Sequence, residues 1–314
     1  MKNGISNHTR PTPAIEVREL THQFRQGRPV LNGLSFSIDP GAVYGLAGPN
    51  GAGKTTTLRI LLGLLRPGAG TARVLGSDFR RADRVNRARV AYVAQEHEVY
   101  GGMTAGELSR FLRSLYPRWD HDYLIKLCQR FGLPTDRQLG RLSGGQRREA
   151  AIALALAART EVLIMDEPAS SLDPLARRKL LRELGEALAE RGETAVLFST
   201  HIMSDLERIA GRVGLLTGGK IALEEDLDAL HAQTRRVQVI LPDGGSSRDL
   251  EIDLPNRLSW KKEGNIESGL VRFPSEDAIE KLVRRTDVRA AVFPVSLEDV
   301  VVEVLETQDK ETRE

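Results

Sequence analysis

Short, almost continuous apolar runs recur along the first two thirds of the chain, and helix-like patterns separate them. The clearest runs are at 43–47, 90–93, 162–165 and 195–199. Their length and composition are typical of buried parallel strands. Apolar residues then recur at helical spacing over 56–65, and helices are predicted through most of 104–158. Shorter strands are predicted between 15 and 34, with turn residues at 26–29. This alternation predicts a three-layer α/β domain with a helical insertion.

Capping chemistry marks two of the predicted helix starts. Thr104 and Glu107 have the spacing of a capping box, in which each side chain satisfies a free backbone N–H group. Asp173 is a favourable N-cap, and Pro174 after it has the fixed φ that suits a first helical position. We therefore expect helices to open at these two points.

The pattern changes after a polar and charged stretch from Glu224 to Thr234. Beyond it, the segments 237–241 and 250–254 alternate as half-buried strands do, and a helix is predicted at 276–285. The segment 297–306 leaves two alternatives open, because its consecutive valines favour a strand and Ser296–Asp299 favours a helix start. The change in pattern predicts a second, small α+β domain.

These patterns divide the chain into three parts. The expected parts are a disordered tail at 1–13, a large domain at 14–225 with a helical subdomain at about 96–158, and a small accessory domain at 226–314.

Composition narrows the range of functions. The 45 Lys and Arg residues nearly balance the 43 Asp and Glu residues, so the charge does not indicate a nucleic-acid surface. Cys128 is the only cysteine, which excludes an intrachain disulfide and the usual clustered-thiol zinc sites. The N-terminus lacks an apolar secretory stretch, and no apolar run approaches the roughly 20 residues that span a membrane. We expect a cytosolic protein unless a partner holds it to a membrane.

The strongest chemical signal is a phosphate-binding loop between a predicted strand and a predicted helix. The loop consists of Gly48, Pro49, Asn50, Gly51, Ala52, Gly53, Lys54 and Thr55. Thr56, the next residue, is also expected to contact the phosphates. Its glycines let the backbone wrap around a phosphate chain with N–H groups pointing inward. We expect Lys54 to reach the β and γ phosphates of a bound phosphate chain and Thr55 to ligate Mg²⁺.

Two adjacent acids supply the second part of the site. The buried strand at 162–165 ends at Asp166, where a carboxylate can hold the Mg²⁺ shell. Glu167 follows, and its carboxylate can orient or deprotonate an attacking water.

With these motifs the chain resembles the ABC ATPase family over about 15–225, and its fold is expected to be that of a P-loop NTPase. The family's signature sequence is matched by Leu142, Ser143, Gly144, Gly145 and Gln146. Ser143 and the following backbone N–H groups form an anion site, which the resemblance implies is used in trans by the nucleotide of a second subunit. The same residues also fit a simple capping box, and the two roles are compatible.

Other positions gain a role from the resemblance alone. Gln95 matches the glutamine that senses Mg²⁺ and touches the membrane subunits, and Asp173 belongs to the segment that resembles the D-loop. His201 resembles the switch histidine at the γ-phosphate. Phe24 stands where the family has the aromatic residue that stacks on adenine, commonly Tyr. The resemblance thus implies Glu167, His201 and Lys54 as catalytic residues and Thr55, Gln95 and Asp166 as the Mg²⁺ site.

The implied function is that of the ATP-hydrolysing subunit of an ABC transporter. The resemblance implies a second ATPase subunit, here a homodimer, and separate transmembrane permease subunits that hold the protein at the inner face of the cell membrane. The segment 295–300 resembles a closing motif of bacterial exporters. Members that act in DNA repair or chromosome maintenance carry long coiled coils, and translation-factor members generally carry two ATPase units. This chain has neither feature, so no nucleic-acid partner is expected. A GTPase is disfavoured because the guanine-reading Asn-Lys-x-Asp motif does not occur.

Two arginines directly follow the signature sequence. Arg147 and Arg148 lie just inside the predicted helix, where they could form a solvated basic face or contact the nucleotide or the partner. The sequence leaves these alternatives open.

Overall fold

The structure is a computed structural model, and it divides into two compact units. It describes residues 12–24, 27–95, 100–170, 172–190, 192–241, 254, 256–284 and 289–311. The first unit contains 1–210 and 216–221, and the second contains 211–215 and 222–314. Most of the predicted tail, residues 1–11, lies outside the described residues. No helix in the described part of the chain combines the length and apolar character that crossing a membrane requires.

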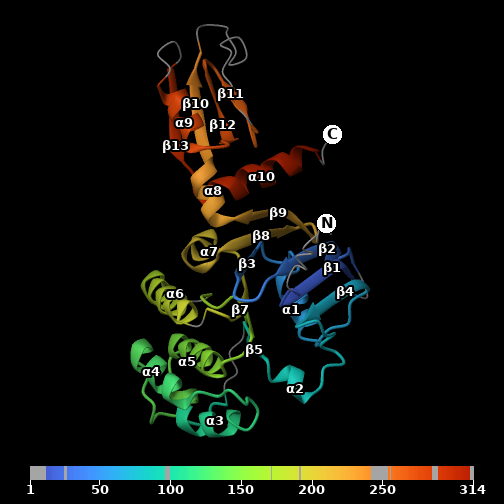
Figure 1. Ribbon diagram of the computed structural model, residues 1–314, viewed down its shortest axis with the longest axis vertical. Helices are drawn as coiled ribbons and strands as arrows, with labels where there is room; N and C mark the ends of the chain where they lie inside the picture. Colours follow the sequence, from blue (N-terminus) through green and yellow to red (C-terminus); the bar gives the residue numbers. More distant parts are fainter. Residues whose placement is uncertain are drawn as a thin grey trace, which may run out of the picture. The chain divides into compact units, whose positions relative to one another are not determined.

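A mainly parallel sheet organises the first unit (Figure 1). Within this unit its strand order is β5-β6-β7-β3. These strands are β3 (Val43–Ala47), β5 (Val90–Val93), β6 (Val162–Asp166) and β7 (Ala195–Thr200). The strands β8 (Arg212–Thr217) and β9 (Lys220–Asp226) have residues in both units. Every residue of β6 and β7 is buried, because helices cover both faces of a parallel sheet. The four strands predicted from continuous apolar runs are confirmed.

A smaller antiparallel sheet lies within the same unit. It has the order β2-β1-β4 and comprises β1 (Ile15–His22), β2 (Leu31–Ile38) and β4 (Ala69–Val74). Leu20, Leu34 and Leu58 are fully buried in the core cluster that this sheet shares with α1 (Lys54–Leu61). The sequence pattern predicted this helix over 56–65, but it ends earlier because Gly63 turns the chain with φ 71°.

Two helices in and beside the helical insertion, α3 and α6, begin where their predicted caps lie. The insertion contains α3 (Ala105–Leu112), α4 (His121–Phe131), the short 3₁₀ turn η1 (Leu139–Arg141) and α5 (Gly144–Ala157). The remaining helices of the unit are α2 (Arg84–Arg87), α6 (Pro174–Ala189) and α7 (Met203–Ile209). The Thr104–Glu107 capping box is formed, and Asp173 accepts hydrogen bonds from two N–H groups at the start of α6. Both predicted helix starts are therefore confirmed.

The second unit is built around an antiparallel sheet with the strand order β11-β12-β10-β13. Its strands are β10 (Thr234–Ile240), β11 (Lys261–Glu263), β12 (Ile266–Arg272) and β13 (Arg289–Pro294). Its helices are α8 (Leu227–Gln233), α9 (Glu276–Val283) and α10 (Leu297–Glu311). Val237, Val271 and Phe273 are buried in its own core cluster. The strand predicted at 250–254 lies outside the described residues except for Leu254.

The ambiguous last segment is a helix. Ser296 Oγ accepts a hydrogen bond from Asp299 N at 3.1 Å, and the Asp299 carboxylate accepts one from Ser296 N at 2.9 Å. This reciprocal cap decides against a strand, because side chains and N–H groups three residues apart meet where a helix begins and not along an extended chain. Val300 and Val301 are buried in the helix that follows.

Candidate functional site

The phosphate-binding loop joins the end of β3 to the start of α1. Gly48, Gly51 and Gly53 all have positive φ. A Cβ atom on Gly48 would lie 2.4 Å from the Leu216 carbonyl oxygen, so only glycine fits the path that the loop takes there. Gly53 is the N-cap of α1 and provides no side-chain cap. The first N–H groups of the helix are therefore left for an anion.

Lys54 lies inside this loop with its side chain largely buried. Its Nζ donates to the carbonyl oxygen of Gly48 at 2.8 Å and to that of Pro49 at 3.2 Å. The same Nζ lies 3.4 Å from Glu167 Oε1. The ammonium group is thus held at the mouth of the loop, between the loop backbone and the carboxylate that follows β6.

Thr55 and Asp166 form a set of hard oxygen ligands. Thr55 Oγ1 donates to Asp166 Oδ1 at 3.1 Å, and Ser199 Oγ donates to the same oxygen at 2.6 Å. Within the described part of the chain, Asp166 Oδ2 is buried and has no hydrogen-bond partner. Burial raises the pKa of Tyr92 to about 12, and the negative charge of Asp166 acts in the same direction. A hydroxyl beside a carboxylate with an unused oxygen suits Mg²⁺.

Glu167 is held in a strained conformation at the end of β6. Its φ is 50°, which a non-glycine residue adopts only when its surroundings impose it. Its N–H group is bound by Ser199, and its Oε2 lies 2.9 Å from His201 Nδ1. The carboxylate therefore stands between Lys54 and His201. Ser199 was not a predicted site residue, because its position near a strand end was the only signal in the sequence.

Lys54, Thr55 and Glu167 border a cleft of about 480 Å³. Asp166 and His201 do not line it but contact Thr55 and Glu167, which do. Its lining residues are Phe24, Val30, Asn50, Gly51, Gly53, Lys54, Thr55, Thr56, Gln95 and Glu167. All of these except Val30 were predicted from the sequence or its resemblance. The Phe24 side chain is 51% exposed and meets His22 edge-on, with ring centroids 4.8 Å apart. The other predicted loop residues belong to the loop but are not among the described residues that line the cleft; these are Gly48, Pro49 and Ala52.

The signature residues form a separate set at the start of α5. Ser143 is the N-cap, its Oγ accepts from Gln146 N, and Gln146 Oε1 accepts from Ser143 N. The described lining of the cleft does not include Ser143, Gly144, Gly145, Gln146 or Asp173. The contact of these residues with a nucleotide in trans stays a proposal.

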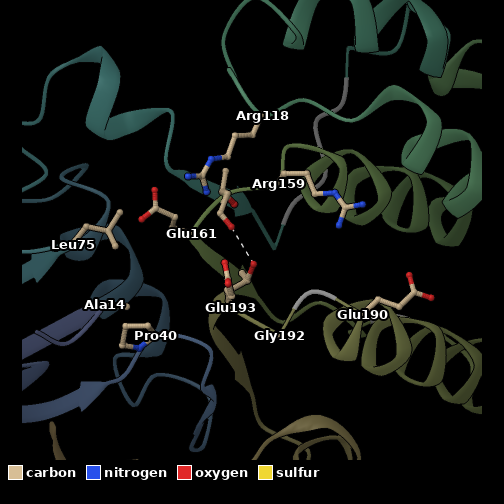
Figure 2. A pocket seen from close by; sticks show the side chains of 11 residues that line it. Ala14, Pro40, Leu75, Arg118, Arg159, Glu161, Glu190, Gly192 and Glu193 are labelled. Carbon is tan, nitrogen blue, oxygen red and sulfur yellow. Dashed lines mark hydrogen bonds between the residues drawn. The ribbon is translucent and has the colours of Figure 1, made fainter. Parts of the chain in front are cut away.

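A larger cavity, of about 630 Å³, lies at the opposite ends of the strands. Figure 2 shows Ala14, Pro40 and Leu75 on one side of it and Arg159 and Glu190 on the other. Glu161 and Thr194, which directly precede β6 and β7, also line it. Ligands of open α/β sheets bind beyond the carboxyl ends of the strands. The smaller cleft contains the phosphate loop, which follows the carboxyl end of β3, so we identify that cleft and not the larger cavity as the site.

Known proteins are similar to this chain in both sequence and fold. Residues 31–170 match the family model described as ABC transporter. The Nod factor export ATP-binding protein I of Paraburkholderia xenovorans (strain LB400) is 35% identical over 92% of this chain and 96% of its own length. The ABC transporter ATP-binding protein YtrB of Bacillus subtilis (strain 168) is 29% identical over 92% of this chain and 97% of its own length.

Solved structures agree with the sequence relatives. The structure of an ATP-binding subunit of an ABC transporter aligns with a TM-score of 0.62 at 28% identity, over 69% of this chain and 92% of its own. The dimeric ATP-binding cassette MJ0796, bound to ADP and Pi, aligns with a TM-score of 0.59 at 23% identity, over 68% of this chain and 98% of its own. The second comparison bears on the fold alone. The chain belongs to the family of ABC transporter ATP-binding proteins.

Proposed function

We propose that this protein hydrolyses ATP as a dimer and drives separate membrane subunits of an exporter. The observation that carries the proposal is a cleft bordered by the phosphate loop and by the Glu167 carboxylate, which lies between Lys54 and His201. Asp166 binds Thr55 beside this cleft. We assign this function to the domain at 14–225, and treat 1–13 and 226–314 as a tail and an accessory domain.

ATP is bound in this proposal by its phosphates. The free N–H groups at the start of α1 and the Lys54 ammonium group attract the phosphate chain. Thr55 and Asp166, together with the exposed Gln95, would hold Mg²⁺, which neutralises charge on the phosphate oxygens when bound. Phe24 offers an exposed ring for the adenine at the edge of the same cleft.

Hydrolysis then depends on the Glu167 carboxylate. This group accepts a proton from the attacking water or orients that water toward the γ-phosphate. His201 Nδ1, at 2.9 Å, fixes the carboxylate and leaves its other ring nitrogen for the phosphate. Lys54 offsets negative charge on the phosphate that is transferred.

The second subunit completes the site. Ser143 and the first N–H groups of α5 form an anion site outside the cleft of their own chain. In a second copy this site would meet the γ-phosphate, with Asp173 nearby. Contacts to the γ-phosphate favour the closed dimer with ATP and are lost with ADP, and this differential affinity drives the change.

Replacing Phe24 with alanine tests the adenine contact. Loss of base stacking is expected to weaken ATP binding by about 1–3 kcal/mol, whereas binding of inorganic tripolyphosphate should stay unchanged. Fluorescence competition measures both affinities, and Phe24→Trp should retain the affinity for ATP. Equal losses for ATP and tripolyphosphate would contradict an adenine contact and indicate a disturbed phosphate loop.

An exposed apolar cluster on the helical insertion is the proposed contact for the membrane subunits. Tyr100 and Phe111 are 64% and 47% exposed, and their rings meet edge-on with centroids 6.3 Å apart. Met103 and Leu115 add further exposed apolar surface in the same part of the chain. This cluster would hold the protein on the cytoplasmic face of the cell membrane. The segment directly after Gln95, which the resemblance also implies in this contact, lies outside the described residues.

Phe111→Asp is expected to abolish copurification of membrane proteins with the tagged full-length chain from detergent-solubilised membranes. The new carboxylate would have to be buried without a partner in an apolar contact. The free energy that this burial costs is larger than the binding free energy that such a contact supplies. Leu64→Asp is the control, since Leu64 is 65% exposed but lies after α1. Copurification of ribosomes or DNA in place of membrane proteins would overturn the transporter assignment.

A further inference from the structure

Arg148 is a buried arginine whose acceptors all belong to loops of the nucleotide site. It is 6% exposed and lies in the second turn of α5. Its Nη1 donates to the carbonyl oxygens of Glu167 (2.9 Å) and Ser170 and to Ser170 Oγ (2.8 Å). Its Nη2 donates to the carbonyl oxygen of Gln95 at 3.1 Å. One side chain thus ties α5 to two segments, one at Gln95 and one at Glu167–Ser170, that are far apart in sequence.

The contact with Glu167 has a particular consequence for the carboxylate. The φ of 50° at Glu167 is strained, and such a conformation persists only where surrounding contacts impose it. Ser199 accepts from the N–H group, and the carbonyl oxygen accepts from Arg148 and, at 3.1 Å, from Ser170 N. These contacts together fix the direction in which the Glu167 side chain leaves the backbone, and therefore the position of its carboxylate beside His201.

The location of Arg148 on α5 adds a connection to the signature residues. Ser143 caps the same helix five residues earlier, a rise of about 7.5 Å along a rigid helix axis. A shift of the helix start must therefore move the guanidinium group as well. Burial lowers the pKa of Arg148, and the charge of Glu167 opposes this effect.

We propose that Arg148 is a positioning residue that connects the signature helix to the catalytic carboxylate and to the Gln95 loop of its own chain. Binding of a partner's nucleotide at Ser143 would then be transmitted through α5 to Glu167 and Gln95. The inference rests on the proposed function, because it assigns a role in ATP hydrolysis. A lysine cannot replace the guanidinium group here, since it lacks the planar fork that reaches several carbonyl oxygens at once.

The test uses Arg148→Lys in the full-length chain. We expect kcat for ATP hydrolysis to fall about 10²-fold, the effect of a misplacement of about 1 Å, while the Kd for a fluorescent ATP analogue changes by less than about threefold. Arg148→Ala should regain part of its activity when methylguanidinium is added. Arg159→Lys is the matched control, because Arg159 follows the same helix and binds Asp120 away from the cleft. The Arg159→Lys variant should keep the wild-type kcat.

Several outcomes would overturn the inference. One is a kcat of Arg148→Lys within about threefold of wild type, and another is a loss of ATP binding that parallels the loss of activity. A wild-type chain that binds ATP without hydrolysing it would count against the proposed function and not against this inference. In that case, hydrogen exchange decides without turnover. Faster exchange near both Gln95 and Glu167 in Arg148→Lys, but not in Arg159→Lys, supports the connection, and unchanged exchange refutes it.

Discussion

Replacing Glu167 with glutamine is expected to slow ATP hydrolysis by about 10²- to 10⁴-fold while ATP binding is retained. The amide keeps the size of the side chain but cannot take a proton from the attacking water. ATP would then stay intact in the closed dimer. Phosphate release measures the rate, and size-exclusion chromatography of the variant with Mg-ATP or Mg-ADP should show a dimer with ATP only.

The matched control for this substitution is Glu161→Gln. Glu161 precedes the same strand, β6, but at its opposite end, where it pairs with Arg89 at 2.7 Å. The Glu161→Gln variant should hydrolyse ATP at the wild-type rate. An active Glu167→Gln protein would show that another group acts on the water. An inactive variant that remains monomeric with ATP would refute the homodimer and require the membrane subunits or a different ATPase for closure.

Lys54→Ala is expected to lower kcat/KM for ATP by about 10²- to 10³-fold, the usual cost of losing one preorganised donor at a transition state. The variant also leaves the buried carboxylate of Glu167 without the ammonium group that lies 3.4 Å from it. Both ATP affinity and the rate should fall, because the lysine contacts phosphates in the ground state and in the transition state. Nucleotide titration and steady-state kinetics separate the two losses.

Lys126→Ala provides the comparison for this variant. Lys126 is a largely exposed lysine on α4 that pairs with Glu190, and its removal should change neither affinity nor rate. Thermal unfolding of both variants checks that the fold is intact. A Lys54→Ala protein that binds ATP with wild-type affinity would contradict the assignment of this loop as the phosphate site.

The sequence alone determined the features that depend on neighbours along the chain. Continuous apolar runs predicted β3, β5, β6 and β7, since a strand buried on both faces needs apolar residues at every position. The phosphate loop was readable because its glycines, Lys54 and Thr55 act within one turn of backbone. Caps at Thr104 and Asp173 marked two helix starts for the same reason.

The tertiary structure decided the contacts between distant segments. Ser199 lies 33 residues from the Asp166 that it binds, and only the pairing of β6 with β7 brings them together. Arg148 lies 53 residues from Gln95, so the pattern of α5 could not distinguish a solvated arginine from a buried one. Side-chain partners of this kind are set by the order of strands and by helix packing, because these place residues side by side whatever their separation in sequence.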